Sequence, residues 1–125
     1  MPNSDMLLVA AAALVDIDGR VLVQQRPEGK SMAGLWEFPG GKVDPGDRDD
    51  TAAALREAQE EVGLEPSNVA VLGHLSAHET VTGFRVTPVV GQLATNFTPV
   101  PEAGEVEEVF HVPLAFLADL ANYTV

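Results

Sequence analysis

Cysteine is absent from this 125-residue chain, basic residues are few, and no hydrophobic run is long. Without cysteine there is neither a disulfide framework nor a thiol nucleophile, and we expect a cytoplasmic location. Seven lysines and arginines stand against nineteen acidic residues, and the net charge of −12 argues against nucleic acid as a partner. A polyphosphate substrate would therefore need divalent cations to approach the protein.

The longest apolar run, residues 6–15, is half the length of a membrane span, which takes about 20 residues. No lysine or arginine precedes Arg20, so the N-terminus lacks the basic region of a signal peptide. We therefore expect no membrane partner. The length and the 46% of hydrophobic residues predict a single domain over residues 1–125, as a monomer or homodimer.

Short apolar runs separated by turn signals predict a mixed sheet with few helices. Residues 7–15 and 21–25 flank an Asp-Ile-Asp-Gly turn and predict a hairpin, and residues 69–75 and 84–93 predict two further strands. Pro88 interrupts the second of these, which predicts an edge position or a bulge. Residues 105–112 predict a last strand, and residues 113–120 predict a helix with proline in its first turn.

The clearest helix signal begins at Asp49 or Asp50 and ends at Gly63. An acidic residue is a good N-cap, the body is rich in alanine, and glycine is the usual C-terminal stop. An apolar face is expected to pack on the core through three residues: Leu55, Ala58 and Val62.

Glu57, Glu60 and Glu61 are spaced i, i+3, i+4, which places three carboxylates on one face of this helix. Like charges at this spacing repel by a few tenths of a kcal/mol, and Glu60 and Glu61 lie at the negative end of the helix dipole. A solvated acidic face is the commoner meaning of such a run. The preceding glycines, the turn and the spacing together favour a site for Mg²⁺, with Mn²⁺ as a substitute.

From Gly41 to Leu64 the chain resembles the Nudix box, written G-x5-E-x7-R-E-U-x-E-E-x-G-U, in which U is aliphatic. Residues 56–64, REAQEEVGL, match its second half, with the small Ala58 at one aliphatic position. The first half departs from the pattern, because Asp47 replaces the first glutamate and eight residues separate it from Arg56. The resemblance implies an α/β fold, a Nudix-type α/β/α sandwich with a mixed sheet, and hydrolysis of a pyrophosphate bond by water.

The resemblance also implies roles for individual residues. Glu57, Glu60 and Glu61 would bind the metal with the carbonyl of Gly41, and Arg56 would orient one of the carboxylates. Glu57, Glu60 and Arg56 are therefore the expected catalytic residues in the helix. The general base would be a box glutamate or an acid on a distant loop, for which the best candidate and its alternatives are Glu105, Glu102, Glu107 and Glu108.

Candidate substrate contacts lie mostly before the helix. Arg26 and Lys42 are candidates for phosphate binding, with solvent-exposed charge as the alternative. Gly40 and Phe38 belong to the FPGGK segment, and Phe38 also fits an ordinary core aromatic. His78 lies between two predicted strands, where a substrate loop would lie, and the histidines show no metal-ligand spacing.

The two halves of the chain resemble different branches of the family. Residues 26–42, RPEGKSMAGLWEFPGGK, resemble the MutT-like nucleoside triphosphate pyrophosphohydrolases. Residues 81–91 and 105–119 resemble the coenzyme A diphosphatases, although the arginine-rich segment that precedes FPGG in those enzymes is not matched. The chain stops at Val125, where both branches continue into a further helix, so a shortened C-terminal helix is expected.

The favoured interpretation is a Mg²⁺-dependent, MutT-like enzyme that cleaves a (d)NTP to a nucleoside monophosphate and pyrophosphate. One alternative is a coenzyme A diphosphatase. Another is a catalytically silent Nudix-fold module that binds a nucleotide ligand or a protein, or a designed or chimeric chain without an evolved substrate. The expected partner is a small-molecule substrate, a nucleotide or other diphosphate.

Overall fold

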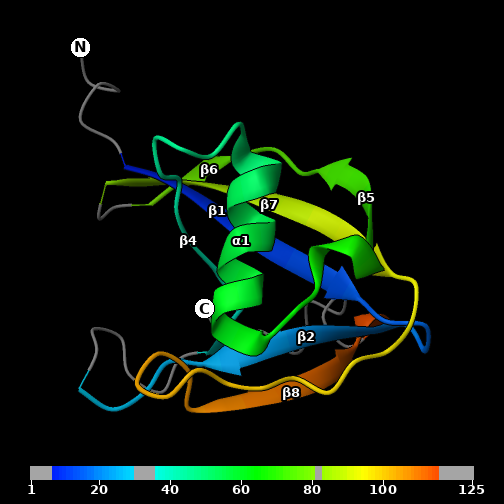
Figure 1. Ribbon diagram of the computed structural model, residues 1–125. Coiled ribbons are helices and arrows are strands. Elements are labelled where there is room, and N and C mark those ends of the chain that lie inside the picture. The colour runs from blue at the N-terminus through cyan, green and yellow to red at the C-terminus, as the bar shows by residue number, and fades with distance from the viewer. Residues whose placement is uncertain (1–6, 30–35, 81–82, 116–125) are drawn as a thin grey trace.

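The computed structural model describes residues 7–29, 36–80 and 83–115, which form a mixed eight-stranded sheet with one α-helix packed on it (Figure 1). The helix is α1 (Asp50–Val62), and a 3-10 helix, η2 (Pro66–Asn68), follows it. The strands in chain order are β1 (Leu7–Val15), β2 (Arg20–Gln25), β3 (Trp36–Glu37), β4 (Gly40–Lys42), β5 (Val69–His74), β6 (His78–Glu79), β7 (Phe84–Leu93) and β8 (Glu108–Pro113). The predicted mixed α/β fold is confirmed.

Strands β1 and β7 form the centre of the sheet. They run parallel, and their pairing extends from Leu7 with Phe84 to Val15 with Gln92. Strands β5 and β6 pair with the other edge of β7, and β4 pairs with β1, all antiparallel. The predicted strands 7–15 and 84–93 are confirmed at both ends, and the continuous apolar sequence of β1 fits a central position in the sheet.

The predicted hairpin of residues 7–15 and 21–25 is confirmed only next to its turn. The two strands pair at Val15 and Val21 alone. Strand β2 then pairs with β8 along its whole length, and β4 takes the place beside β1, where Gly40 pairs with Ala11. The expectation was wrong for the rest of the hairpin because a local turn signal does not reveal the more distant partners β4 and β8.

The turn between β1 and β2 is held by the buried carboxylate of Asp16. It accepts hydrogen bonds from the backbone N–H groups of Asp18 (3.0 Å) and Arg20 (2.8 Å) and from the Arg20 side chain (2.9 Å). Burial alone would raise the pKa of Asp16, but these hydrogen bonds outweigh it and lower the pKa. Asp16 therefore fixes the direction in which β2 leaves the turn.

Pro88 lies inside the central strand β7, so neither an edge position nor a bulge at Pro88 itself explains it. It lies where the partner of β7 changes, since His78 of β6 pairs with Val86 and His74 of β5 pairs with Val89. The irregularity is in the partner strand β5, between residues 71 and 73. The break between β5 and β6 makes the missing N–H of proline tolerable in the ladder.

Both predicted ends of the helix are confirmed. Asp49 is the N-cap, and its carboxylate accepts a hydrogen bond from the N–H of Ala52 at 2.8 Å. Gly63 ends the helix in the left-handed conformation with φ of 75°, which glycine adopts without strain. The fully buried residues of α1 are small except for the last: Ala53, Ala54, Ala58 and Val62.

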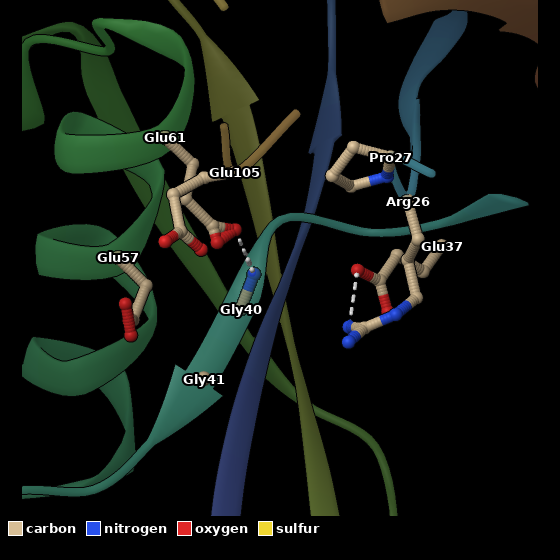
Figure 2. Close-up of a pocket in the computed structure, with 8 residues that line it drawn as sticks. All are labelled: Arg26, Pro27, Glu37, Gly40, Gly41, Glu57, Glu61 and Glu105. Carbon is tan, nitrogen blue, oxygen red and sulfur yellow. Dashed lines mark hydrogen bonds and ion pairs between the residues drawn. The ribbon is translucent and has the colours of Figure 1, made fainter. Parts of the chain in front are cut away.

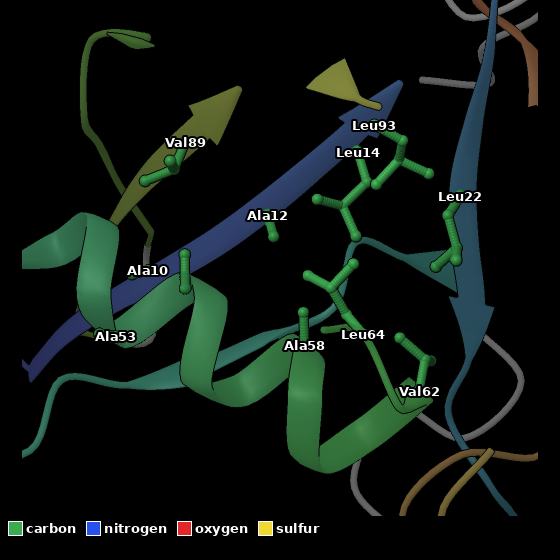
Figure 3. Packing of buried hydrophobic residues seen from close by; sticks show 11 residues of the cluster. Ala10, Ala12, Leu14, Leu22, Ala53, Ala58, Val62, Leu64, Val89 and Leu93 are labelled. Atoms are coloured by element: carbon green, nitrogen blue, oxygen red, sulfur yellow. The ribbon is translucent and has the colours of Figure 1, made fainter. Parts of the chain in front are cut away.

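Alanine dominates the contact between α1 and the sheet, as Figure 3 shows. Ala10 and Ala12 of β1 are buried in the same cluster as Ala53 and Ala58 of the helix. Leu55, expected on the apolar face, is only partly buried against this cluster. Because side chains this small fill little space, the helix lies close to the sheet at β1 and β4.

Two predicted elements at the C-terminal end have different outcomes. The strand predicted at residues 105–112 is shifted, since β8 begins at Glu108 and extends to Pro113. Residues 116–125 lie outside the described part of the chain, and with them most of the predicted helix 113–120, the shortened C-terminal helix and the second helical layer of a sandwich. Within the described residues, no helix has the length and apolar character needed to cross a membrane.

The burial of two leucines predicts a large loss of stability on truncation of one and almost none on truncation of the other. Leu64 is fully buried, whereas Leu72 is 66% exposed on β5. We expect Leu64→Ala to lower the free energy of unfolding by about 2–5 kcal/mol, because it leaves a cavity in the core. Leu72→Ala is the matched control and should change it by less than about 0.5 kcal/mol, as measured by urea denaturation. A small effect of Leu64→Ala would contradict the packing described for α1.

Candidate active site

A cavity of about 190 Å³ opens between α1, β4 and the end of β2 (Figure 2). The residues around it come from distant parts of the sequence and are rich in acids: Arg26, Pro27, Glu37, Gly40, Gly41, Glu57, Glu61 and Glu105. The fold therefore brings together six of the residues predicted for the site: Arg26, Gly40, Gly41, Glu57, Glu61 and Glu105. We call this cavity the acidic pocket.

Glycine in β4 gives the helix acids access to the acidic pocket. Glu57 and Glu61 lie one helical turn apart on α1 and both face β4 (Figure 2). A Cβ atom at Gly41 would overlap the carboxylate of Glu57, and one at Gly40 would lie 2.5 Å from the carbonyl oxygen of Ala10. Gly40 is thus required by its close approach to the backbone of β1, whereas a Cβ atom at Gly41 would displace the flexible carboxylate of Glu57.

Glu61 is the most enclosed acid of the pocket. Its Oε1 accepts hydrogen bonds from the side-chain amide of Gln24 at 2.8 Å and from the N–H of Gly40 at 3.3 Å. Burial raises the pKa of Glu61 to about 7, and the nearby charges of Glu57 and Glu37 add to this, while the two hydrogen bonds act in the opposite direction. Near neutral pH, Glu61 is therefore poised between its protonated and ionised forms.

Glu57 is also protected from solvent, with a side chain that is 17% exposed. Burial raises its pKa, and the nearby guanidinium of Arg56 opposes this shift. The lining holds four acids, Glu37, Glu57, Glu61 and Glu105, against the single cation Arg26. An excess of carboxylates is common where they bind a metal ion.

Arg56 lies beside the pocket and holds several acids in place. Its guanidinium forms two parallel bonds of 3.0 Å to Asp47 and a further bond of 3.2 Å to Glu60. It also donates to the backbone carbonyl of Lys42 at 3.2 Å, which ties α1 to β4. The predicted orienting arginine thus binds chiefly Asp47, and this bond lowers the pKa of Asp47.

Asp47 stands where the family pattern has glutamate, and the structure places it on Arg56 despite the extra residue between them. Its side chain is 8% exposed, and one oxygen also accepts the N–H of Asp44 at 2.8 Å. The longer loop before α1 brings the shorter aspartate within reach of the guanidinium. Asp47 therefore forms an ion pair with Arg56 although the sequence departs from the pattern at this position.

Glu60 lies outside the lining of the acidic pocket. Its side chain is 53% exposed and is bound to Arg56. In the part of the chain that the structure describes, no three acidic or histidine side chains form a ready-made set of metal ligands. Metal binding by Glu57, Glu60 and Glu61 together therefore remains a prediction.

The remaining predicted site residues have mixed positions. Arg26 lies in the pocket wall, where its guanidinium pairs with Glu37 at 3.3 Å. The lining does not include Lys42, which is exposed, or Phe38, which is half-buried. His78 is exposed in β6, where it pairs with Val86, and it also lies outside the lining.

Sequence reasoning missed Gln24, which binds Glu61, and Glu37, which binds Arg26. The signal for Gln24 is its place in the strand RVLVQQ, where a polar residue continues an otherwise buried run. Such a side chain needs a partner inside the protein. Glu37 could not be identified from the sequence alone. It comes close to Arg26 only because β3 pairs with β2.

The raised pKa of Glu61 predicts a pH-dependent cost in stability for the metal-free protein. Between the unfolded value near 4.5 and the folded value of about 7, the folded state binds the extra proton. Stability from this group therefore falls as pH rises through that interval and stays reduced above it. In EDTA at pH 8, we expect Glu61→Gln to raise the free energy of unfolding by roughly 2 kcal/mol, because solvent in the pocket screens part of the penalty, with little gain at pH 4.

Thermal or urea unfolding at the two pH values measures this difference. Exposed Glu79→Gln in β6 is the matched control and should change little at either pH. Equal stabilisation by Glu61→Gln at pH 4 and pH 8 would contradict a buried carboxylate with a raised pKa.

Comparisons of the chain with known proteins identify its relatives. The model of the NUDIX domain matches residues 6–123. The peroxisomal coenzyme A diphosphatase NUDT7 of Mus musculus is 60% identical over 79 residues, which cover 63% of this chain and 34% of the mouse protein. The uncharacterized Nudix hydrolase NudL of Klebsiella pneumoniae (strain 342) is 46% identical over 118 residues, covering 90% of this chain and 62% of the relative. The chain thus spans less than two thirds of the length of either relative.

Solved structures agree on the fold. An Ap4A hydrolase of C. elegans superimposes with a TM-score of 0.75 at 21% identity, covering 92% of this chain and 86% of that one. A MutT protein of Methanosarcina mazei Go1 superimposes with a TM-score of 0.69 at 25% identity, covering 88% and 78%. With a domain model that matches nearly its whole length, this chain belongs to the Nudix family of hydrolases.

Proposed function

We propose that the chain is a Mg²⁺-dependent hydrolase of the pyrophosphate bond in coenzyme A or a close derivative of it. The observation that carries the choice of substrate is the 60% identity, over 79 residues, to a mouse protein named as a coenzyme A diphosphatase. The likeness of residues 81–91 and 105–119 to that branch agrees with this choice. The sequence motifs favoured a nucleoside triphosphate as the substrate. We propose coenzyme A instead because of the identity to the mouse protein.

The donors around the acidic pocket fit a hard divalent cation. Two partly buried carboxylates, Glu57 and Glu61, face the pocket together with backbone glycine, and Mg²⁺ and Mn²⁺ prefer oxygen ligands of this kind. Glu60 is the third predicted ligand and would have to exchange its bond to Arg56 for the metal. Its 53% exposed side chain leaves room for that rotation.

The register of β4 favours Gly40 over Gly41 as the source of a carbonyl ligand. The Pro39 carbonyl and the Val43 N–H both bond to β1. Backbone bonds in an antiparallel pair recur at every second residue, so Gly41 also directs its polar groups toward β1. Gly40 directs its own groups away from β1, and its N–H reaches Glu61. We therefore assign the carbonyl ligand to Gly40.

Bound Mg²⁺ would offset charge on the phosphate oxygens and lower the pKa of a coordinated water. Glu57 and Glu61 place two carboxylates in the pocket wall. Arg56 binds the loop before α1 to the helix that carries both of them. Glu105 enters the pocket from the loop before β8 and is the candidate base for the attacking water (Figure 2). Arg26, aligned by Glu37, offers a positive charge to the substrate phosphates.

A MutT-like nucleoside triphosphate pyrophosphohydrolase is the second candidate. Residues 26–42 resemble that branch, and a MutT protein of Burkholderia pseudomallei is 29% identical with a TM-score of 0.64. The bond broken would again be a pyrophosphate linkage. The products differ, because coenzyme A gives adenosine 3′,5′-bisphosphate and 4′-phosphopantetheine, whereas a dNTP gives a monophosphate and pyrophosphate.

The decisive assay offers coenzyme A, dGTP and ADP-ribose separately, each with Mg²⁺ and with EDTA, and separates the products by anion-exchange chromatography. We expect adenosine 3′,5′-bisphosphate from coenzyme A with Mg²⁺ and none with EDTA. Glu57→Gln should lower kcat/KM at least about 100-fold, because it removes a carboxylate from the pocket. Glu79→Gln lies outside the pocket lining and should retain the wild-type rate.

Three results would overturn the proposal. Cleavage of dGTP alone would assign the second candidate, and a folded protein that cleaves none of the three would indicate a ligand-binding module. Coenzyme A cleavage that is insensitive to Glu57→Gln would place the chemistry outside the acidic pocket.

A further inference from the structure

We infer that Gln24 is a positioning residue that holds the carboxylate of Glu61 in place for metal binding. The inference rests on the metal site of the proposed function and adds a residue outside the Nudix box. Gln24 lies on β2, is 2% exposed, and does not line the acidic pocket. It therefore acts on the pocket through Glu61.

The hydrogen bonds of Glu61 are unevenly divided between its two oxygens. Oε1 accepts both the Gln24 amide at 2.8 Å and the Gly40 N–H at 3.3 Å. Neither bond uses Oε2. Two donors on one oxygen fix the plane of the carboxylate and leave the other oxygen available to a ligand in the pocket.

The opposite end of the Gln24 amide shows that the residue is costly for the fold. Its Oε1 is buried and has no hydrogen-bond partner. The ionised carboxylate of Glu61 only accepts hydrogen bonds, so in that form the NH₂ group of Gln24 faces Glu61 and its carbonyl oxygen points away. A buried acceptor without a partner is unfavourable, and an apolar residue at position 24 would avoid this penalty. Fold stability alone does not account for glutamine here.

Charge explains why a neutral donor suits this position. Arg56 orients Asp47 and Glu60 with a full positive charge, which competes with any cation for those carboxylates. The Gln24 amide orients Glu61 without neutralising it. The ionised carboxylate thus keeps its charge for a metal ion, while its position stays fixed by the sheet.

The test compares Gln24→Met with Gln92→Met in the full chain, using Mn²⁺ binding by calorimetry and thermal unfolding. Methionine is close to glutamine in size and removes only the amide. We expect Gln24→Met to weaken Mn²⁺ binding by about 10–100-fold while Tm stays unchanged or rises. Gln92 donates to the carbonyls of Val15 and Asp16, so Gln92→Met should lower Tm and leave Mn²⁺ affinity unchanged.

A double-mutant cycle with Glu61→Gln shows whether Gln24 acts through Glu61. In the Glu61→Gln background, Gln24→Met should have no further effect on Mn²⁺ affinity. An undiminished further effect there would overturn the inference, as would wild-type affinity in Gln24→Met. If Gln24→Met does not fold, Gln24→Leu replaces it, and failure of both to fold would assign a structural role and overturn the inference.

The wild-type protein separates this inference from the proposed function. Mn²⁺ binding that depends on Gln24, without hydrolysis of coenzyme A, would support the inference and remove the proposed substrate. Hydrolysis of coenzyme A with no effect of Gln24→Met on metal affinity would support the proposed function and overturn the inference about Gln24. A wild-type protein that binds no Mn²⁺ would overturn both.

Discussion

The close approach of α1 to the sheet is the constraint on which the site depends. Alanines on both surfaces, with glycines in β4, bring the backbone of the helix near enough for its glutamates to reach β4. Larger residues would push the helix outward and separate Glu57 and Glu61 from the backbone of Gly40 and Gly41. The small core residues therefore serve geometry as much as stability, since alanine buries less apolar surface than leucine or valine.

The electrostatics of the pocket run against the stability of the fold. Burial raises the pKa of both Glu57 and Glu61, and a buried amide oxygen of Gln24 lacks a partner. Arg56 and its partners offset part of this by anchoring the loop before α1. Sites at which local interactions oppose folding are expected where a ligand completes the structure, and a divalent cation between these carboxylates would do so.

Local signals in the sequence were sufficient for the helix and for the long strands β1, β2, β5 and β7, but not for the short strands β3, β4 and β6. Asp49 and Gly63 cap the helix as predicted, because capping depends on neighbouring residues only. Pairings between distant segments were not predictable in this way, so the partner of β2 was wrong and the role of Gln24 was missed. The spacing of Glu57, Glu60 and Glu61 gave their common face but not their different exposure, which depends on Arg56 and β4.

Replacing Gly41 with alanine tests most directly whether close approach positions the carboxylates. A Cβ atom there overlaps the carboxylate of Glu57, whereas one at Gly46 meets nothing within 4 Å, which makes Gly46→Ala the matched control. We expect Gly41→Ala to remain folded and to lose about tenfold or more in Mn²⁺ affinity, with Gly46→Ala unchanged. Wild-type Mn²⁺ affinity in Gly41→Ala would contradict the dependence of the site on the approach of α1 to β4.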